Sequence, residues 1–171
     1  MRRLLYPLLL LALLAGNPAH ADSAEQIRRG AVDALALLRD HVEGADELLA
    51  SAAGVLVFPD VVKLGFGVGG EYGEGVLLVA GEPAGYYATS GANFGLPTGS
   101  RVKSEVVVFA SESALKAFLG QRSWRVGEGG LVLASAPSAD LPDATVGYVF
   151  SETGLVPGLT LEGARFTRLA R

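Results

Sequence analysis

The residues best suited to catalysis are two glutamates in the glycine-rich centre of the sequence. Glu71 and Glu74 lie three positions apart in the segment Gly69-Gly70-Glu71-Tyr72-Gly73-Glu74. Two nearby carboxylates can act as a general acid and a general base, or can bind a hard cation. Glutamates in a glycine-rich turn are more often solvated, however. We therefore predict solvated side chains, and an enzymatic role only if both carboxylates line one pocket.

Other catalytic and metal-binding arrangements have little support in the sequence. Cysteine is absent, which excludes thiol catalysis, disulfides and cysteine-based metal sites. Beyond residue 21 the single histidine is His41, and one histidine argues against a zinc site. Ser90 lacks the glycine two residues earlier that a nucleophile elbow requires. We therefore expect a protein that is not an enzyme and has no metal or cofactor, with His41 at the surface.

The segment Gly65-Phe66-Gly67-Val68-Gly69-Gly70 matches the letters of the dinucleotide-binding fingerprint GxGxxG. That site needs a helix to begin there, so that its first amides can bind the pyrophosphate. The following residues, Glu71 to Gly75, begin a helix poorly and place carboxylates where phosphates would lie. No crossover helix separates the segment from the next apolar run. We therefore do not expect nucleotide binding.

The same segment has a period of two, because Gly65, Gly67 and Gly69 alternate with Leu64, Phe66 and Val68. On a strand, this alternation leaves one face as bare backbone and packs the other. Glycine weakens a strand, so three in alternation need a reason. Close approach of another backbone, a bend in a curling sheet and a ligand on the bare face all remain open.

The N-terminus has the features of a signal peptide. Met1-Arg2-Arg3 is basic, Leu4–Leu14 is mostly apolar, and Ala19-His20-Ala21 fits a cleavage site. The apolar run is shorter than the roughly 20 residues that a membrane-spanning helix needs. We therefore predict a signal peptide over residues 1–21 and a periplasmic or secreted mature chain. The absence of cysteine excludes a lipoprotein.

The remaining residues, 22–171, suit a single domain. With 18 acidic and 14 basic residues the chain has a formal net charge of −4, which argues against nucleic-acid binding. Contact with anionic lipid would therefore need a local basic cluster. Basic residues do cluster weakly, at Arg28 and Arg29, at Arg101 and Lys103, and in a C-terminal group of Arg165, Arg168 and Arg171. Each cluster is most simply a solvated face or a set of ion pairs, and two clusters together would suffice to bind an anion.

Hydrophobic periodicity predicts helices first and strands afterwards. Helical spacing covers residues 23–43, with Ser23 and Gln26 as a capping box, and shorter helices cover residues 46–53 and 111–119. Strands are predicted at 55–58, 75–80, 106–109, 131–134, 145–151 and 159–169. Several of these are apolar throughout, which is typical of strands that are buried on both faces. The sheet is therefore either covered by helices or curled onto itself.

Pro59 is expected to close the first strand. Lys63 would then lie in a turn between two apolar strands, just before the alternating glycines. Because loops carry function more often than cores do, Lys63 is a candidate binding residue.

The order of short motifs along the chain resembles that of the SYLF-domain family. The motifs that carry the resemblance are Gly54-Val55-Leu56-Val57-Phe58-Pro59, Gly65-Phe66-Gly67-Val68-Gly69-Gly70, Gly73-Glu74-Gly75, Gly85-Tyr86-Tyr87, Gly91-Ala92-Asn93-Phe94-Gly95, Trp124-Arg125-Val126-Gly127 and Leu159-Thr160-Leu161-Glu162-Gly163. They cover nearly all of residues 22–171. The sequence departs from the family at Leu96-Pro97-Thr98-Gly99-Ser100-Arg101, where relatives often carry glutamines. Many bacterial relatives look like exported proteins or lipoproteins, and this sequence also departs from the family in lacking a lipobox cysteine.

The resemblance implies an α+β fold that is mainly β. Its curled antiparallel sheet would be barrel- or sandwich-like, with N-terminal helices and one further helix packed on it. The resemblance also implies lipid binding. Eukaryotic relatives bind phosphoinositide membranes, partly through an N-terminal amphipathic helix, and some bind actin. An exported protein would meet neither partner in its own cell, so we do not expect either one.

We therefore expect an exported, non-enzymatic domain that binds lipid or phospholipid at the cell envelope. Lipid headgroups or acyl chains would be its partners, with acyl chains on the apolar side of the first helix or on the sheet beneath it. The candidate lipid-binding residues are Arg28, Arg29, Lys63, Gly65, Gly67, Gly69, Arg101 and Lys103. The alternative is a structural or protein-interaction module of the envelope with no small-molecule ligand, in which the glycines permit tight sheet closure.

Overall fold

The computed structural model describes residues 22–64, 69–92, 102–126, 133–134, 145–151, 154–156, 161 and 163–171. These residues form three helices and nine strands. The predicted α+β, mainly β class is confirmed, with a curled and mostly antiparallel sheet that does not close into a barrel. The predicted signal peptide, together with Gly65, Gly67 and Arg101, lies outside the described residues.

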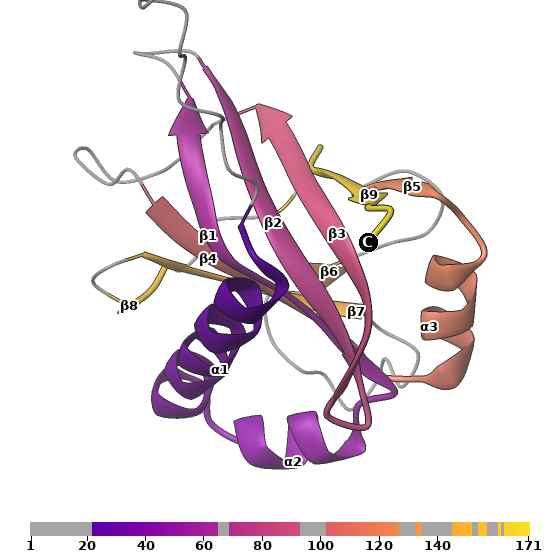
Figure 1. Ribbon diagram of the computed structural model, residues 1–171. Coiled ribbons are helices and arrows are strands. Elements are labelled where there is room, and N and C mark those ends of the chain that lie inside the picture. Colours follow the sequence, from indigo (N-terminus) through magenta and orange to yellow (C-terminus); the bar gives the residue numbers. More distant parts are fainter. Residues whose placement is uncertain are drawn as a thin grey trace, which may run out of the picture.

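The helices begin where the sequence predicts them. Helix α1 spans Ala24–His41, and its capping box is present, because Ser23 Oγ accepts a hydrogen bond from the Gln26 amide at 3.1 Å. Helix α2 (Ala45–Ser51) follows directly. Helix α3 (Glu112–Leu119) is capped by Ser111, whose Oγ accepts from the Ala114 amide at 3.2 Å. Figure 1 shows α1 and α2 on one side of the sheet and α3 on the other.

The strands form one sheet in the order β5-β9-β3-β2-β1-β4-β7-β6, and β8 pairs with β7 outside this path. All described pairings are antiparallel except that of β6 with β7. The strands are β1 (Gly54–Leu64), β2 (Gly70–Val79), β3 (Glu82–Ala92), β4 (Val102–Phe109), β5 (Ser123–Arg125), β6 (Leu133–Ala134), β7 (Thr145–Ser151), β8 (Gly154–Leu155) and β9 (Arg165–Arg168).

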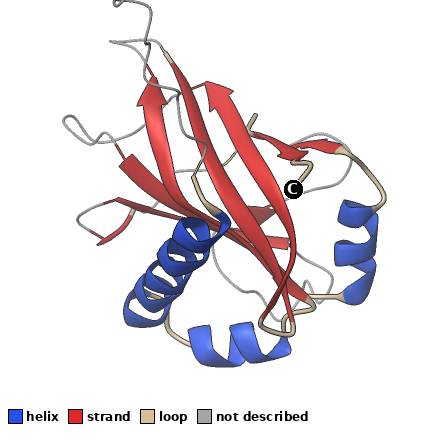
Figure 2. Cartoon of the chain, in the orientation of Figure 1, coloured by secondary structure: helices blue, strands red, loops and turns tan. Residues whose placement is uncertain are grey.

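Each face of the sheet has its own hydrophobic core, which explains the continuous apolar runs. In β1, Val55 and Val57 face the core under α1, whereas Leu56 and Phe58 face the core under α3. The apolar stripe of α1 is almost completely buried, since Ile27 and Leu38 are 1% and 0% exposed. Figure 2 shows the resulting helix layers on the two sides of the strands. The prediction of strands buried on both faces is confirmed.

Pro59 does not end the first strand, so that prediction is wrong. Strand β1 continues to Leu64, and its register shifts between Phe58 and Val61 on the side of β4. A bulge tolerates proline because the ladder there lacks a regular hydrogen bond. The Pro59 carbonyl instead accepts a hydrogen bond from Ser104 Oγ at 2.6 Å. Lys63 therefore lies in a strand opposite Glu71, and not in a turn.

The last strand is shorter than predicted in the described part of the chain. Strand β9 begins at Arg165, because Gly163 just before it has a positive φ of 80°. An L-residue rarely adopts this conformation, which glycine reaches without cost. The turn at Gly163 directs the chain into β9, between β3 and β5.

Two glycines of β2 permit the main chain of β1 to approach closely at the bulge. A Cβ on Gly73 would lie 2.7 Å from the Asp60 carbonyl oxygen, and one on Gly75 would lie closer still to the Val57 carbonyl oxygen. Real Cβ atoms essentially never come this close to another heavy atom. Of the reasons considered for glycine in this region, close backbone approach applies to these two positions.

Candidate functional site

Helix α1 covers only part of its face of the sheet. Beyond the start of the helix, one row of directly paired residues crosses five strands, with the register Val62–Tyr72–Ser90–Arg165–Arg125. Directly paired residues project to the same side of a sheet. Leu64 projects to that side as well, because it lies two positions after Val62. We call these six residues the outer sheet face.

The β1–β2 end of the outer sheet face is apolar. Val62, Leu64 and Tyr72 are 42%, 53% and 42% exposed. They are three of the five large hydrophobic residues that are exposed in the described part of the chain. Single exposed apolar residues are ordinary on protein surfaces, whereas neighbouring ones mark interaction sites. This end of the face is therefore suited to contact an apolar partner.

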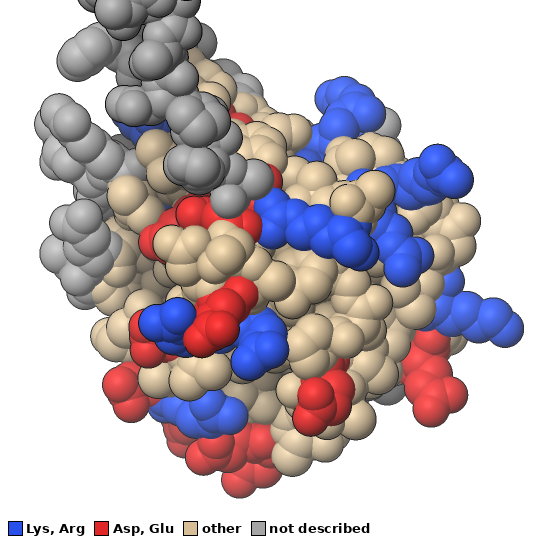
Figure 3. All heavy atoms as spheres, viewed as in Figure 1, with Lys and Arg blue, Asp and Glu red and all other residues tan. Residues whose placement is uncertain are grey.

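The β9–β5 end of the same face is basic. Arg165 and Arg125 are exposed and directly opposite each other in the pairing of β9 with β5. Like charges in this position destabilise a sheet. No described carboxylate forms an ion pair with Arg165. The Arg168 amide donates to the Arg122 carbonyl at 3.1 Å, but the Arg168 side chain projects to the opposite side of β9 from Arg165, because it lies three positions later. Figure 3 shows basic side chains gathered where Figure 1 places β5, β9 and the C-terminus.

A polar cluster separates the outer sheet face from α1. Glu74 accepts a hydrogen bond from the Tyr72 hydroxyl at 2.9 Å and pairs with the Arg171 guanidinium. That guanidinium also donates to the Asp22 carbonyl at 2.6 Å and lies 5.9 Å from the centre of the Tyr86 ring. Burial raises the pKa of Tyr72, and the hydrogen bond to Glu74 raises it further. Arg171 therefore holds Asp22, just before the start of α1, and neutralises the charge of Glu74.

Glu71 lies in a second, deeply buried polar cluster. Lys103 Nζ is 2.9 Å from carboxylate oxygens of both Glu71 and Glu105, and Thr89 Oγ1 donates to Glu105 at 3.1 Å. Burial lowers the pKa of Lys103, but the two carboxylates outweigh it and the net shift is upward. Burial also raises the pKa of Glu105, against the opposing effects of Lys103 and Thr89.

The prediction of two solvated glutamates is therefore wrong, because Glu71 and Glu74 are each only 7% exposed. The two side chains also project from opposite faces of β2, since they are an odd number of positions apart. Each carboxylate is bound to its own cation, Lys103 or Arg171. This arrangement does not provide the shared pocket that an acid and base pair would need.

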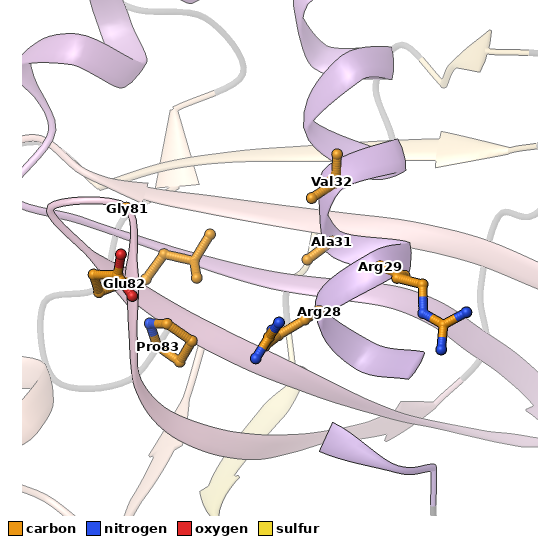
Figure 4. A pocket seen from close by; sticks show the side chains of 8 residues that line it. Arg28, Arg29, Ala31, Val32, Gly81, Glu82 and Pro83 are labelled. Carbon is orange, nitrogen blue, oxygen red and sulfur yellow. The ribbon is translucent and has the colours of Figure 1, made fainter. Parts of the chain in front are cut away.

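The other candidate residues predicted from the sequence do not come together in one site. Arg28 and Arg29 both line a hollow beside α1 (Figure 4), and Arg29 is exposed and pairs with Glu25 at 3.1 Å. Lys63 is half-buried, and Gly69 lies just before β2. Lys103, at 5% exposure and between two carboxylates, is placed to stabilise the core and not to meet a lipid headgroup. His41 is exposed, as predicted.

Sequence reasoning missed the apolar half of the outer sheet face and one of its two central arginines. Val62 and Leu64 were missed because Pro59 is expected to end the first strand, and Tyr72 was missed because the next strand is expected to begin at residue 75, whereas β2 begins at Gly70. Arg125 was noted only within the Trp124-Arg125-Val126-Gly127 motif. The alternation of apolar and polar residues at Val62-Lys63-Leu64 is the signal that would have extended the strand.

Within the described ranges, no group of three or more histidine, cysteine, aspartate or glutamate side chains is arranged to bind a metal ion. None of the helices there combines the length and apolar composition needed to cross a membrane. A comparison of the whole chain with models of known protein families and with curated protein sequences finds no match.

Proposed function

We propose that this protein binds anionic phospholipid surfaces through the outer sheet face and catalyses no reaction. The observation that supports the proposal is that a pair of arginines and an exposed apolar area lie on the same outer sheet face. The opposed arginines Arg125 and Arg165 lie at one end, and the exposed Val62, Leu64 and Tyr72 lie at the other. An apolar area next to basic side chains is the combination that interfacial membrane binding requires.

Both halves of the face contribute to binding in different ways. Each arginine near an anionic membrane surface contributes about 1 kcal/mol, and salt screens this contribution. Val62 and Leu64 contribute by burying apolar area among the headgroups and upper acyl chains. The ring of Tyr72, with its hydroxyl directed to Glu74, has the mixed polarity that is common at membrane interfaces.

The proposed surface differs from the one that the sequence suggested. The apolar side of α1 is buried against the sheet, with Ala31 and Ala34 at 1% and 2% exposure. Acyl chains could reach it only if the helix detached and opened the core beneath it. The outer sheet face needs no such rearrangement. The resemblance to the SYLF-domain family supports lipid binding in general, and the predicted signal peptide supports a location at the cell envelope.

Vesicle co-sedimentation tests the proposal. We expect binding to phosphatidylglycerol vesicles at low salt, weaker binding at high salt, and little binding to phosphatidylcholine vesicles. Replacing Leu64 by serine and Arg165 by glutamine should each weaken binding several-fold. Lys116→Gln is the matched control, because Lys116 is an exposed cation on α3, away from this face. Absence of binding to both kinds of vesicle at low salt would refute the proposal.

The alternative is a structural or protein-interaction module of the envelope with no small-molecule ligand. Its support is the close packing at Gly73 and Gly75, which explains part of the glycine content without any ligand. This alternative predicts that the wild-type protein binds neither phosphatidylglycerol nor phosphatidylcholine vesicles. It also predicts that outer-face substitutions weaken the capture of one defined envelope protein.

A further inference from the structure

A groove beside α1 is separate from the outer sheet face. Two adjoining hollows with volumes of about 370 and 320 Å³ lie between α1 and the β2–β3 connection. They share Leu78 and Gly81 as lining residues, so they form one continuous groove. Arg28 lines one hollow and Arg39 lines the other, and the two residues are eleven positions apart on α1, which corresponds to roughly 16 Å.

The floor and walls of the groove between these arginines are mostly apolar. The residues of this kind that line it are Ala31, Val32, Leu35, Leu49, Ala50, Ala52, Val55, Leu78, Ala80 and Pro83. Val32 is the most exposed large hydrophobic residue in the described part of the chain, at 66%. Apolar pockets of a few hundred Å³ with a small number of polar groups are typical binding sites for small amphiphilic ligands.

Arg28 differs from the other arginines of α1 in what it contacts. Arg29 pairs with Glu25 at 3.1 Å, and Arg39 pairs with Asp46 at 3.0 Å. Arg28 forms no ion pair with any carboxylate in the described part of the chain. Arg28 and Arg29 both line this hollow, and Figure 4 shows the Arg28 guanidinium reaching from α1 towards Pro83 and the Arg29 guanidinium directed the other way. Arg28 is therefore the cation available to a ligand in this groove.

We propose that the groove binds a single-chain anionic amphiphile of the fatty-acid class, with its carboxylate at Arg28. The planar guanidinium suits a carboxylate, which it can bind through two parallel hydrogen bonds. The chain would extend along Val32 and Leu35 on α1 and Leu78 on β2, towards Leu49 and Val55. Arg39 does not compete for the headgroup, because Asp46 already holds it.

Glu82 sets the direction of the ligand in the groove. It lines the same hollow as Arg28, and Figure 4 shows its carboxylate on the far side of Pro83 from the guanidinium. An anionic headgroup is repelled by Glu82 and attracted by Arg28, so it binds on the α1 side of the hollow. A neutral headgroup has no such preference, which makes the charge of the ligand a measurable determinant.

Isothermal titration of the purified protein with laurate, below its micellar concentration, tests this proposal. The wild-type protein should bind laurate and prefer it to dodecanol, its neutral counterpart of the same chain length. Arg28→Gln should weaken laurate binding about tenfold, as expected for loss of a charge-assisted hydrogen bond, and should abolish the preference over dodecanol. Arg29→Gln is the matched comparison, since it removes the same charge one residue away in the same hollow, and it should weaken laurate binding much less because Arg29 is already paired with Glu25.

Val32→Asp provides a second variant that leaves the core intact, because Val32 is exposed. It places a negative charge on the rim of the groove and should weaken laurate binding with little effect on dodecanol. Absence of laurate binding by the wild-type protein would overturn the proposal, as would equal losses in Arg28→Gln and Arg29→Gln. Arg165→Gln should not change laurate binding, and Arg28→Gln should not change vesicle binding. The proposal for the groove and the proposal for the outer sheet face can therefore be refuted independently of each other.

Discussion

Lys103 Nζ lies 2.9 Å from Glu105 Oε1, and the side chains of the two residues are 5% and 0% exposed. The same ammonium contacts Glu71, so one cation serves two carboxylates inside the sheet. A buried charge is tolerated only when it is paired and hydrogen-bonded. Glu71 comes from β2, Thr89 from β3, and Lys103 and Glu105 from β4. This polar cluster therefore fixes the register of three strands, in addition to apolar packing.

Replacing Lys103 by methionine should destabilise the protein by about 3–5 kcal/mol, because it leaves two buried carboxylates without their cation. Urea denaturation monitored by circular dichroism measures this change. Lys116→Met is the control and should change the free energy of unfolding by less than about 0.5 kcal/mol, since Lys116 is exposed on α3. The double variant Lys103→Met/Glu105→Gln should recover part of the loss. An unchanged midpoint for Lys103→Met would contradict this account.

Replacing Gly75 by alanine should destabilise the protein by at least about 2 kcal/mol, because the new methyl group would lie 2.5 Å from Phe58 Cδ1. Gly70→Ala, in the same strand, is a matched control. The nearest atom to its methyl group would be the Gly91 carbonyl oxygen at 3.6 Å, an ordinary contact. Thermal unfolding of both variants measures the difference, and equal midpoints would show that close approach of β1 does not require glycine at position 75.

Arg165→Gln should have opposite effects on stability and on binding. It removes one of two like charges that face each other across β9 and β5, so stability should rise by about 0.2–1 kcal/mol. The same change should weaken binding to anionic vesicles several-fold. Denaturation and co-sedimentation of one protein preparation measure both quantities. If Arg165→Gln lowers stability, the two arginines do not repel each other in the folded protein.

The stability of the protein should depend on pH through Asp60. Burial raises the pKa of this carboxyl above its ordinary value of 3.8, and the nearby Asp22 and Asp33 raise it further. The folded state therefore holds the proton more tightly than the unfolded state, and stability falls as the pH rises through the folded-state pKa. Asp60→Asn should stabilise the protein at neutral pH, by less than about 1 kcal/mol for a partly exposed group.

The gain from Asp60→Asn should disappear at a pH below the unfolded-state value, where Asp60 is protonated in both states. Denaturation of the wild-type and variant proteins across the acidic range measures this dependence. Asp33→Asn is a useful companion, because it should produce part of the same gain by lowering the repulsion on Asp60. A gain that is independent of pH would show that the charge of Asp60 is not its cause.

The helices and most of the strands could be predicted from local signals. The Ser23 and Gln26 capping box and the apolar stripe of α1 are properties of a few neighbouring residues, and the structure has both. Strand β7 has the bounds that its apolar residues predict, Thr145–Ser151. The bulge at Pro59 was not predictable in this way, because whether proline ends a strand depends on the strands beside it.

The sequence by itself determined the helices and most of the strands, because hydrophobic periodicity and caps act over short distances along the chain. It also determined which residue types were available, and it left few candidates for nucleophilic or thiol chemistry. Only the tertiary structure decided that Arg165 meets Arg125, that Glu71 and Glu74 are separated by the sheet, and that Arg28 faces a groove. These relationships arise from pairing between distant segments, and strand register places Ser90 opposite Arg165 and Arg125 opposite the same Arg165 although they are far apart in sequence.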